Sequence, residues 1–247
     1  MYRVVEVGSF SCPKPSKLVN EDFLLHPIYD KGSNLIFAVA DGVGSSSKAS
    51  EASTSVINAV FDFASQNSDF CIESALFYAK EKLDQGLKAI DANGSSATTL
   101  TVVHVTRSEI VIGHIGDCRA YLKKENKLFQ LTKDHTRFQE LLDSNEYSLK
   151  KLNKHKEELS SIITKALAYG VDIDFDIYRY PIEELPSEKS MIITLMSDGA
   201  YNHWHRRARF SQSTMNSPTA FTTSLRRRIE KGPTDDYTCL SVKLERQ

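Results

Sequence analysis

The chain has 247 residues, of which 40% are hydrophobic and 26% are charged. This composition is typical of a globular protein and excludes a disordered or fibrous chain. The 31 Lys and Arg residues nearly balance the 32 Asp and Glu residues, and the net charge of −1 lacks the basic excess of nucleic-acid-binding proteins. The sequence contains no apolar run of about 18 residues, so we expect no membrane-spanning helix.

The cysteines are scattered along the chain, and no two of them form a CxxC pair. A zinc site of that type is therefore not expected. The first residues do not combine a basic segment with a long apolar core and a cleavage site, as a secretory signal does. We therefore expect a reduced, cytoplasmic protein.

The first predicted elements are a strand and two helices. The apolar run Asn34–Ala40 ends at Asp41-Gly42, which predicts a buried strand followed by a turn. The segments Ser47–Gln66 and Phe70–Ile90 carry apolar residues at helical spacing. This spacing predicts two amphipathic helices, each with one buried face.

The pattern then changes to strands rich in β-branched residues. Strands are predicted at Thr98–Val105, Glu109–Ile115 and Arg119–Leu122, and residues 123–126 are typical of a hairpin turn before a returning strand at Leu128–Leu131.

The second half of the chain begins with a charged segment, Thr136–Leu167, which we predict to be helical. Further strands are predicted at Phe175–Tyr180, Met191–Met196 and Tyr237–Leu244. The strands come in runs with helices between the runs, which favours an α+β fold of packed sheets with helices outside. No linker or internal repeat divides the chain, so we expect one domain.

Several apolar strands end in an Asp beside a Gly, at Asp41-Gly42, Gly116-Asp117 and Asp198-Gly199. Asp235-Asp236 precedes the last strand, and Asn20-Glu21-Asp22 precedes another apolar stretch. Any single Asp-Gly pair could be only a turn. If the carboxylates converge, however, they repel one another unless a cation is present, and oxygen ligands select hard ions such as Mg²⁺ or Mn²⁺.

Between Lys17 and Thr238 the chain contains, in order, VNEDF, VADGVG, GSSATTL, IGDCRAYL, LTKDHT, ITKAL, MSDG and DDYT. These motifs resemble those of the metal-dependent protein serine/threonine phosphatases of type 2C, in their compact bacterial form. The resemblance implies one catalytic domain over residues 1–247 with a flap at about 136–165. It also implies a β-sandwich of two mainly antiparallel sheets with helices on both sides, an αββα arrangement in four layers.

The resemblance also implies a site that holds two Mg²⁺ or Mn²⁺ ions. In that site Asp41 bridges both ions, and the carbonyl of Gly42 lies on one of them. Asp198 and Asp235 complete the other ion's ligands.

Further positions at the edge of this site follow from the same resemblance. Glu21 and Asp22 would mostly hold metal-bound water. Asp117 would belong to a third, weaker metal site.

Three positions depart from the family pattern. Lys17 stands where the family usually has Arg, and a lysine offers phosphate a point charge instead of a bidentate fork. Val43 replaces a His found after the DG pair in eukaryotic members. Asp236 replaces the Asn of a usual DN pair, so either Asp235 or Asp236 could be the ligand.

The implied reaction is direct hydrolysis of a phosphoserine or phosphothreonine ester by a metal-bridging water, without a covalent intermediate. Asp41, Asp198 and Lys17 would be the catalytic residues, with Lys17 offsetting charge on the phosphoryl oxygens. Metal-bound water is the expected proton donor to the leaving group, and His114 and His135 are alternatives that we interpret as structural.

The expected partners are phosphorylated proteins, without nucleic acid or membrane, and we expect a monomer. A non-catalytic phosphoprotein-binding module of the same fold is the alternative, and Lys17 and Asp236 are the features that keep it open. A different metallohydrolase with aspartates at its strand ends is a further alternative.

We interpret two other features of the sequence as surface structure. The arginines at 206, 207, 209 and 226–228 are predicted to lie on solvated helix faces, with an anionic docking patch as the alternative. His203-Trp204-His205 is predicted to lie in an exposed loop.

Overall fold

The computed structural model describes residues 2–43, 48–88, 96–185 and 190–246. Within these ranges, one antiparallel sheet has five strands in the order β1-β12-β11-β7-β8. Its strands are β1 (Tyr2–Cys12), β12 (Tyr237–Arg246), β11 (Ser190–Met196), β7 (Arg119–Lys124) and β8 (Lys127–Gln130).

The second sheet is also antiparallel and has seven described strands. Its order is β10-β6-β5-β3-β4-β9, and β2 pairs with β3. The strands are β10 (Asp176–Pro181), β6 (Glu109–Ile115), β5 (Leu100–Val105), β3 (Leu35–Val43), β4 (Ala97–Thr98), β9 (Leu167–Ala168) and β2 (Asp22–Tyr29).

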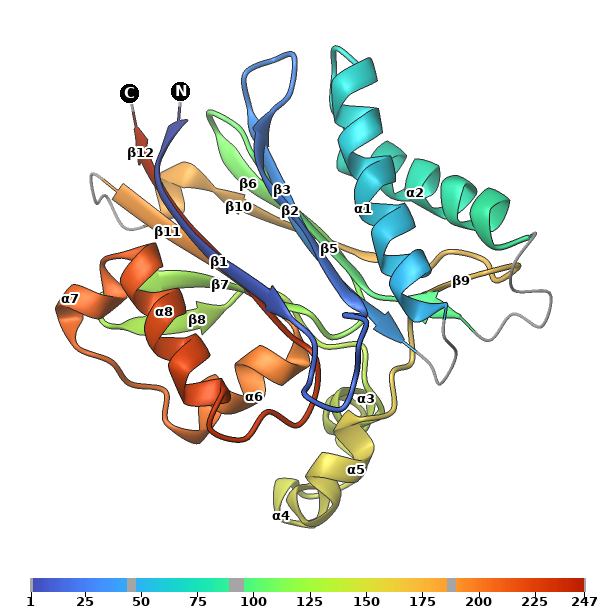
Figure 1. The fold of residues 1–247 in the computed structure, drawn as a ribbon, viewed down its shortest axis with the longest axis vertical. Coiled ribbons are helices and arrows are strands. Elements are labelled where there is room, and N and C mark those ends of the chain that lie inside the picture. Colours follow the sequence, from blue (N-terminus) through green and yellow to red (C-terminus); the bar gives the residue numbers. More distant parts are fainter. Residues whose placement is uncertain (1, 44–47, 89–95, 186–189, 247) are drawn as a thin grey trace.

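The two sheets face each other, and helices cover their outer faces (Figure 1). Helices α1 (Ala49–Gln66) and α2 (Ile72–Leu87) lie on the seven-stranded sheet. Helices α6 (Asp198–Arg206), α7 (Gln212–Met215) and α8 (Pro218–Ile229) lie on the five-stranded sheet. This arrangement confirms the predicted αββα fold.

A set of short helices projects from one end of the sandwich (Figure 1). They are α3 (Arg137–Asp143), α4 (Leu149–Leu152), the 3₁₀ helix η1 (Asn153–His155) and α5 (Lys156–Ser160). Thr136 and Ile163 form a β-bridge where the segment leaves and rejoins the body.

The central strand β3 shows why the apolar run 35–40 carries no alternation of polar and apolar residues. Ile36, Ala38 and Ala40 face the helices α1 and α2, whereas Leu35 and Phe37 face the other sheet. Both faces of the strand are therefore buried, and each position needs an apolar side chain.

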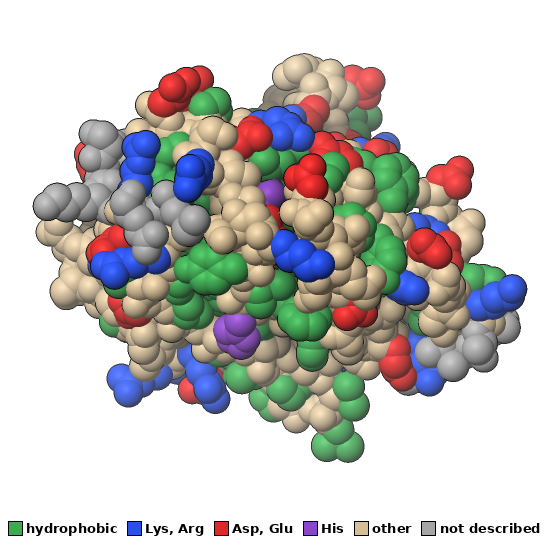
Figure 2. Space-filling model, turned by 90° about the horizontal axis from the view of Figure 1, so that it is seen from above, with side chains coloured by type: hydrophobic (Ala, Val, Ile, Leu, Met, Phe, Trp, Pro, Cys, Tyr) green, Lys and Arg blue, Asp and Glu red, His purple; other side chains and the backbone are tan. Residues whose placement is uncertain are grey.

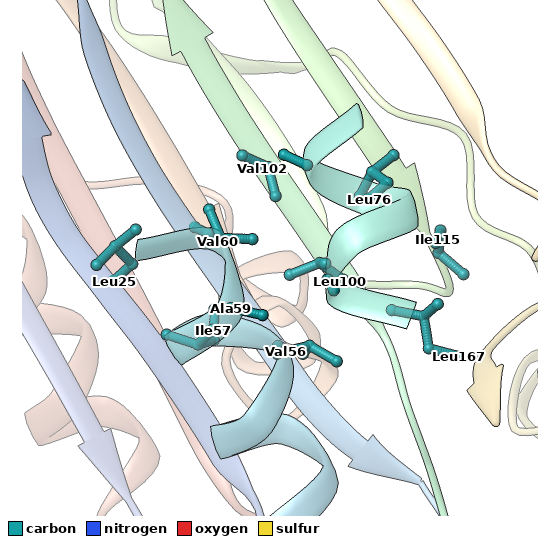
Figure 3. Close-up of a cluster of buried hydrophobic side chains, with 14 of the residues drawn as sticks. Leu25, Val56, Ile57, Ala59, Val60, Leu76, Leu100, Val102, Ile115 and Leu167 are labelled. Carbon is teal, nitrogen blue, oxygen red and sulfur yellow. The ribbon is translucent and has the colours of Figure 1, made fainter. Parts of the chain in front are cut away.

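The helices α1 and α2 pack closely against their sheet (Figure 3). A Cβ atom on Gly113 of β6 would lie 2.5 Å from Cγ2 of Ile72 and 3.0 Å from Cδ1 of Leu76. Glycine at position 113 therefore lets α2 approach the sheet, and the side chain of Leu76, which is fully buried, fills the interface.

Most predicted elements are present, with ends shifted by a few residues. The first residue of the helix predicted at 47–66 and the last two of that predicted at 70–90 lie outside the described residues, as do Gly44, Gly94 and Ser95 of the family motifs.

Two predictions were wrong. The segment Thr136–Leu167 is not continuously helical, because it contains short helices, a β-bridge and the start of β9. His203-Trp204-His205 lies in helix α6 instead of an exposed loop. The physical reason is Trp204, which is 2% exposed and packs against Phe221 of α8 at a ring separation of 5.3 Å.

Figure 2 looks down on the end of the sandwich where the chain termini lie, and there acidic and basic side chains are interspersed.

No helix among the described residues combines the length and the apolar character that a membrane span requires.

We expect the substitution Leu76→Ala to lower the free energy of unfolding by about 2–5 kcal/mol, because it leaves a cavity between α2 and the sheet. Urea unfolding monitored by circular dichroism measures this change. Phe61→Ala on α1 is the control, since Phe61 is 45% exposed and its removal should cost less than about 1 kcal/mol. Equal losses for the two variants would contradict the packing described for α2.

Candidate metal-binding active site

Asp22 and Asp41 face each other on neighbouring strands, because the antiparallel pairing of β2 with β3 sets these two residues opposite each other. Asp22 is 2% exposed. The backbone of Asp41 is held firmly: its N–H donates to Thr99 Oγ1 at 2.9 Å, and its carbonyl accepts from Thr99 N at 2.8 Å. Like charges directly opposite each other destabilise a sheet, so this pair requires compensation.

Asp198 joins the pair from the other sheet, since it is the first residue of α6, directly after β11. The preceding residue ties three strands together: Ser197 Oγ donates to Asp22 Oδ2 at 2.7 Å and accepts from Thr238 N of β12 at 2.9 Å. A Cβ atom on Gly199 would lie 2.0 Å from the carbonyl oxygen of Asp236. Glycine at 199 therefore permits α6 to begin against the chain that carries Asp235 and Asp236.

Asp117 follows the end of β6 in a tight turn. Gly116 has a φ of +100°, which favours glycine, and a Cβ atom there would lie 2.4 Å from Cγ2 of Thr99. Asp117 is 4% exposed, and its Oδ2 accepts a hydrogen bond of 3.3 Å from the hydroxyl of Tyr201.

Electrostatic repulsion links these carboxyls. Burial, followed by the charge of Asp198, raises the pKa of Asp117 to about 8 and contributes to raising the pKa of Asp22 to about 7. Burial and the charge of Asp235 raise the pKa of Asp198 to about 6. Burial and the charges of Asp22, Asp198 and Asp117 raise the pKa of Asp41 well above its ordinary value. The cluster therefore resists ionisation unless a cation joins it.

Two carboxylate oxygens in the cluster are candidate metal donors. Asp22 Oδ1 and Asp117 Oδ1 are buried and have no hydrogen-bond partner among the described residues. Oxygen donors of this kind suit Mg²⁺ or Mn²⁺. Across residues 2–43, 48–88, 96–185 and 190–246, however, no three His, Cys, Asp or Glu side chains have the arrangement of a formed metal site. The carboxyl groups thus supply the oxygen donors that Mg²⁺ or Mn²⁺ prefers, but they are not arranged as a formed metal site in this structure.

The structure distinguishes the adjacent residues Asp235 and Asp236. Asp236 is 3% exposed, and its two carboxylate oxygens accept from the N–H groups of Lys14 at 2.9 Å and Glu21 at 2.8 Å. The side chain of Asp235 is 49% exposed, and its charge acts on Asp198. Asp236 therefore fixes the loop between β1 and β2, whereas the carboxylate of Asp235 accepts from Lys14 Nζ at 3.3 Å and is close enough to act on the charge of Asp198.

Lys17 and Glu21 lie beside this loop and form an ion pair with each other. Lys17 Nζ also lies 3.7 Å from Asp236 Oδ2. Burial alone would lower the pKa of Lys17, but the hydrogen bond to Glu21 and the charges of Asp236 and Glu21 raise it. The side chain of Glu21 thus holds Lys17, while its carbonyl oxygen accepts from Gly42 N at 3.0 Å.

The two histidines near the cluster are held by the protein. His114 has Nδ1 2.9 Å from Thr101 Oγ1 and Nε2 3.0 Å from the carbonyl oxygen of Lys133, and burial lowers its pKa to about 3. His135 accepts from Gly116 N at its Nδ1 atom, and its Nε2 lies 3.1 Å from Asp176 Oδ2. These contacts support the interpretation of both residues as structural.

Arg119 is a cation beside the cluster that the sequence analysis did not single out. Its guanidinium donates to both oxygens of Asp134, at distances from 2.5 to 3.1 Å, and lies 3.7 Å from the ring centroid of Tyr201. Its charge lowers the pKa values of Asp117 and Asp198. The only available signal was its position two residues after Asp117 in the IGDCRAYL motif.

The raised pKa values predict how the metal-free protein responds to pH. Asp117 has a pKa of about 8 in the folded chain and an ordinary value of 3.8, so the folded state binds more protons than the unfolded state between these values. Stability therefore falls as pH rises through this window. The buried His114 and His135 have lowered pKa values and act in the opposite direction only below about 6.5.

We therefore expect Asp117→Asn to stabilise the metal-free protein more at pH 8 than at pH 5, with a gain of up to about 1.4 kcal/mol per pH unit. Urea unfolding in EDTA at both pH values measures this difference. Asp62→Asn is the control, because Asp62 is exposed on α1 and should show no pH-dependent gain. A gain for Asp117→Asn that shrinks between pH 5 and pH 8 would contradict the electrostatics described above.

Known proteins resemble this sequence over most of its length. The family model described as Protein phosphatase 2C matches residues 15–230. The serine/threonine phosphatase Stp of Listeria welshimeri is 28% identical over 182 residues, which cover 70% of this chain and 69% of that protein. A putative protein phosphatase of Mycoplasma genitalium is 26% identical over 251 residues, which cover 94% of this chain and 92% of that protein.

A solved structure shares the fold. The catalytic domain of the serine/threonine protein phosphatase PstP, in complex with two manganese ions, matches with a TM-score of 0.76 and 19% sequence identity, covering 100% of both chains. Since the family model matches most of the sequence and its motifs occur in order, the chain belongs to the protein phosphatase 2C family and is a protein phosphatase.

Proposed function

We propose that this phosphatase hydrolyses phosphoserine and phosphothreonine esters in proteins and requires Mg²⁺ or Mn²⁺. The observation that carries the proposal is the group of four carboxyls, buried at Asp22 and Asp117 and half-buried at Asp41 and Asp198, whose mutual repulsion and burial raise their pKa values. Its two unpartnered oxygens support a cation site. The names of the bacterial relatives and the manganese ions of the PstP structure agree with this chemistry.

In this proposal, Asp41, the carbonyl of Gly42, Asp198 and Asp235 would hold two ions. Divalent ions held there would offset the charge of the carboxylates and supply a water of lowered pKa as the nucleophile for phosphorus. No covalent intermediate on a protein side chain is needed.

The outer part of the site follows the same proposal. Asp22 and Glu21 orient water at the edge of the site, and Asp117 serves a third, weaker ion. Asp22 keeps one oxygen bound to Ser197 and leaves the other without a partner, which suits this role.

Lys17 is proposed to bind the phosphoryl group. Its ammonium group forms ion pairs with Glu21 and Asp236 beside the loop between β1 and β2. Its position is therefore fixed before a substrate binds. Because an ammonium is a point charge, it attracts phosphate oxygens without the bidentate geometry of arginine.

The leaving group must gain a proton. Both ring nitrogens of His114 have hydrogen-bond partners in the protein, whereas His135 accepts from Gly116 N at Nδ1 and has its Nε2 enclosed 3.1 Å from Asp176 Oδ2. Water in the site is therefore the proposed proton donor.

We also propose that residues 1–247 form a single catalytic domain, with residues 136–165 as a flap beside the site. The hydrogen bonds from Arg137 N to Ile162 O and from Thr164 N to His135 O support this role, because they fasten both ends of the flap next to His135.

We expect Asp41→Asn and Asp198→Asn each to lower kcat by more than about 100-fold, because each removes a charge that holds the cations. Hydrolysis of a phosphothreonine peptide and of p-nitrophenyl phosphate with added Mn²⁺, then with excess EDTA, measures the effect. Asp62→Asn makes the same chemical change at an exposed position and should leave turnover unchanged. Turnover that survives EDTA, or no turnover with added Mn²⁺, would overturn the proposal, and the second result would favour a binding module.

We expect Lys17→Ala to raise KM for the phosphothreonine peptide about 10-fold, with a smaller change in kcat. Lys17→Arg should recover most of the affinity, since the positive charge is retained. Lys88→Ala, at an exposed position at the end of α2, is the control. If Lys17→Ala lowers thermal stability but leaves KM unchanged, Lys17 only fastens the loop through Glu21 and Asp236.

A further inference from the structure

A second polar site lies between α6 and α8, on the outer side of the five-stranded sheet. It is a pocket of about 540 Å³, which we call the α6–α8 pocket. Its wall includes five basic residues and one histidine: Arg206, Arg207, Arg227, Arg228, Lys231 and His203. Among the residues that the structure describes, no Asp or Glu lines it.

The positive charges of this pocket are not balanced by acidic neighbours. Among the described residues, none of its five basic side chains forms an ion pair with a carboxylate. Arg226, which directly precedes Arg227 on α8, does have an acidic partner, since its Nε donates to Glu230 Oε1 at 2.8 Å. The chain carries a net charge of −1, so this local excess of positive charge is a property of the pocket and not of the whole molecule.

Arg228 gives the pocket a fixed shape. Its guanidinium donates to the carbonyl oxygens of Arg207 at 2.6 Å and Arg209 at 3.2 Å, and lies 4.2 Å from the ring centroid of Phe210. The loop that follows α6 is thereby fastened to α8. Burial and the nearby charge of Arg207 lower the pKa of Arg228.

His203 provides an independent sign of a missing partner. The residue is 4% exposed, and its Nε2 atom is buried without a hydrogen-bond partner in the described part of the chain. A buried polar atom without a partner costs free energy. A ligand oxygen in the pocket, or a water held by such a ligand, would satisfy it.

The pocket is separate from the acidic cluster. Helix α6 begins at Asp198 and ends at Arg206, so the two sites lie about 12 Å apart along its axis. The rings of Trp204 and Phe221 pack between α6 and α8, and this contact fixes the two helices that form the pocket relative to each other.

Because the guanidinium groups of the pocket have no carboxylate partner among the described residues and His203 Nε2 has no hydrogen-bond partner there, we propose that the α6–α8 pocket binds a phosphate group and does not hydrolyse it. Guanidinium groups match phosphate oxygens in geometry and charge. A pocket without carboxylates has no residues to hold the cations that hydrolysis would need. Free inorganic phosphate and a phosphorylated side chain of a protein offer the same chemistry, and the experiment below separates them. The inference does not depend on the proposed function, because it uses no residue of the acidic cluster.

Trp204 is the only tryptophan of the chain, and its ring lies 5.9 Å from the guanidinium of Arg228. Its fluorescence therefore reports on this pocket. We expect a saturable change in fluorescence when phosphate is added to the full-length protein in EDTA at constant ionic strength. The same titration is repeated with a phosphoserine peptide and with its unphosphorylated form. Saturation at a lower concentration of the phosphopeptide than of free phosphate identifies a phosphorylated side chain as the ligand, and the reverse order identifies free phosphate.

The double substitution Arg207→Ala with Arg227→Ala should raise the dissociation constant at least about 10-fold, since two charged hydrogen-bond donors are lost. Arg226→Ala removes the same charge from the same helix, where it is already paired with Glu230, and should change binding less than about 2-fold. Asp41→Asn should leave binding intact, so that failure of the pocket can be distinguished from failure of the catalytic proposal.

His203→Phe tests the orphaned nitrogen separately and should weaken binding several-fold while urea unfolding confirms that the variant is folded. The inference is overturned if no saturable change occurs with phosphate or with the phosphopeptide. It is also overturned if the double variant and Arg226→Ala bind equally well.

Discussion

Repulsion among carboxylates that are buried or half-buried dominates the physical chemistry of this site. Asp22 and Asp41 are set opposite each other by the pairing of β2 with β3, and Asp198 and Asp117 add to the charge around them. Such an arrangement opposes folding unless protons or cations offset the charge. A protein that retains it gains something other than stability, and binding of divalent cations is the gain that oxygen donors of this type can provide.

The scaffold makes this arrangement possible by using both sheets. Ser197 connects β11 to Asp22 of the seven-stranded sheet and to β12 of its own sheet. Gly42 and Gly199 allow close backbone contacts, because a Cβ atom at either position would lie within 2.5 Å of a carbonyl oxygen. The apolar layers between and outside the sheets hold these elements in register. The site is therefore a product of the packing of the whole sandwich and not of any single loop.

The parts of the fold that could be predicted are those where packing leaves a clear pattern. The run at 35–40 is apolar because both faces of β3 are buried, and α1 and α2 each show one apolar face. The segment after Thr136 lacks such a pattern, because its short helices bury few side chains, so charge alone suggested a longer helix. The location of His203-Trp204-His205 depends on the packing of Trp204 against Phe221 of α8, a contact between two helices that no local sequence pattern indicates.

For the site, the sequence located the acidic residues but not their environments. Asp235 and Asp236 are adjacent and chemically identical, and only the three-dimensional contacts show that Asp236 is used by the backbone of Lys14 and Glu21. Arg119 was missed for a similar reason, since its role depends on Asp134 and Tyr201.

Binding of divalent cations among these carboxylates is the property from which the catalytic proposal follows. X-ray data from crystals of the protein soaked in Mn²⁺, collected on both sides of the manganese absorption edge, would locate such ions. We expect anomalous peaks about 2.0–2.6 Å from carboxylate oxygens of Asp41 and Asp198. A well-ordered site with no anomalous signal there, at Mn²⁺ concentrations that support turnover, would contradict it.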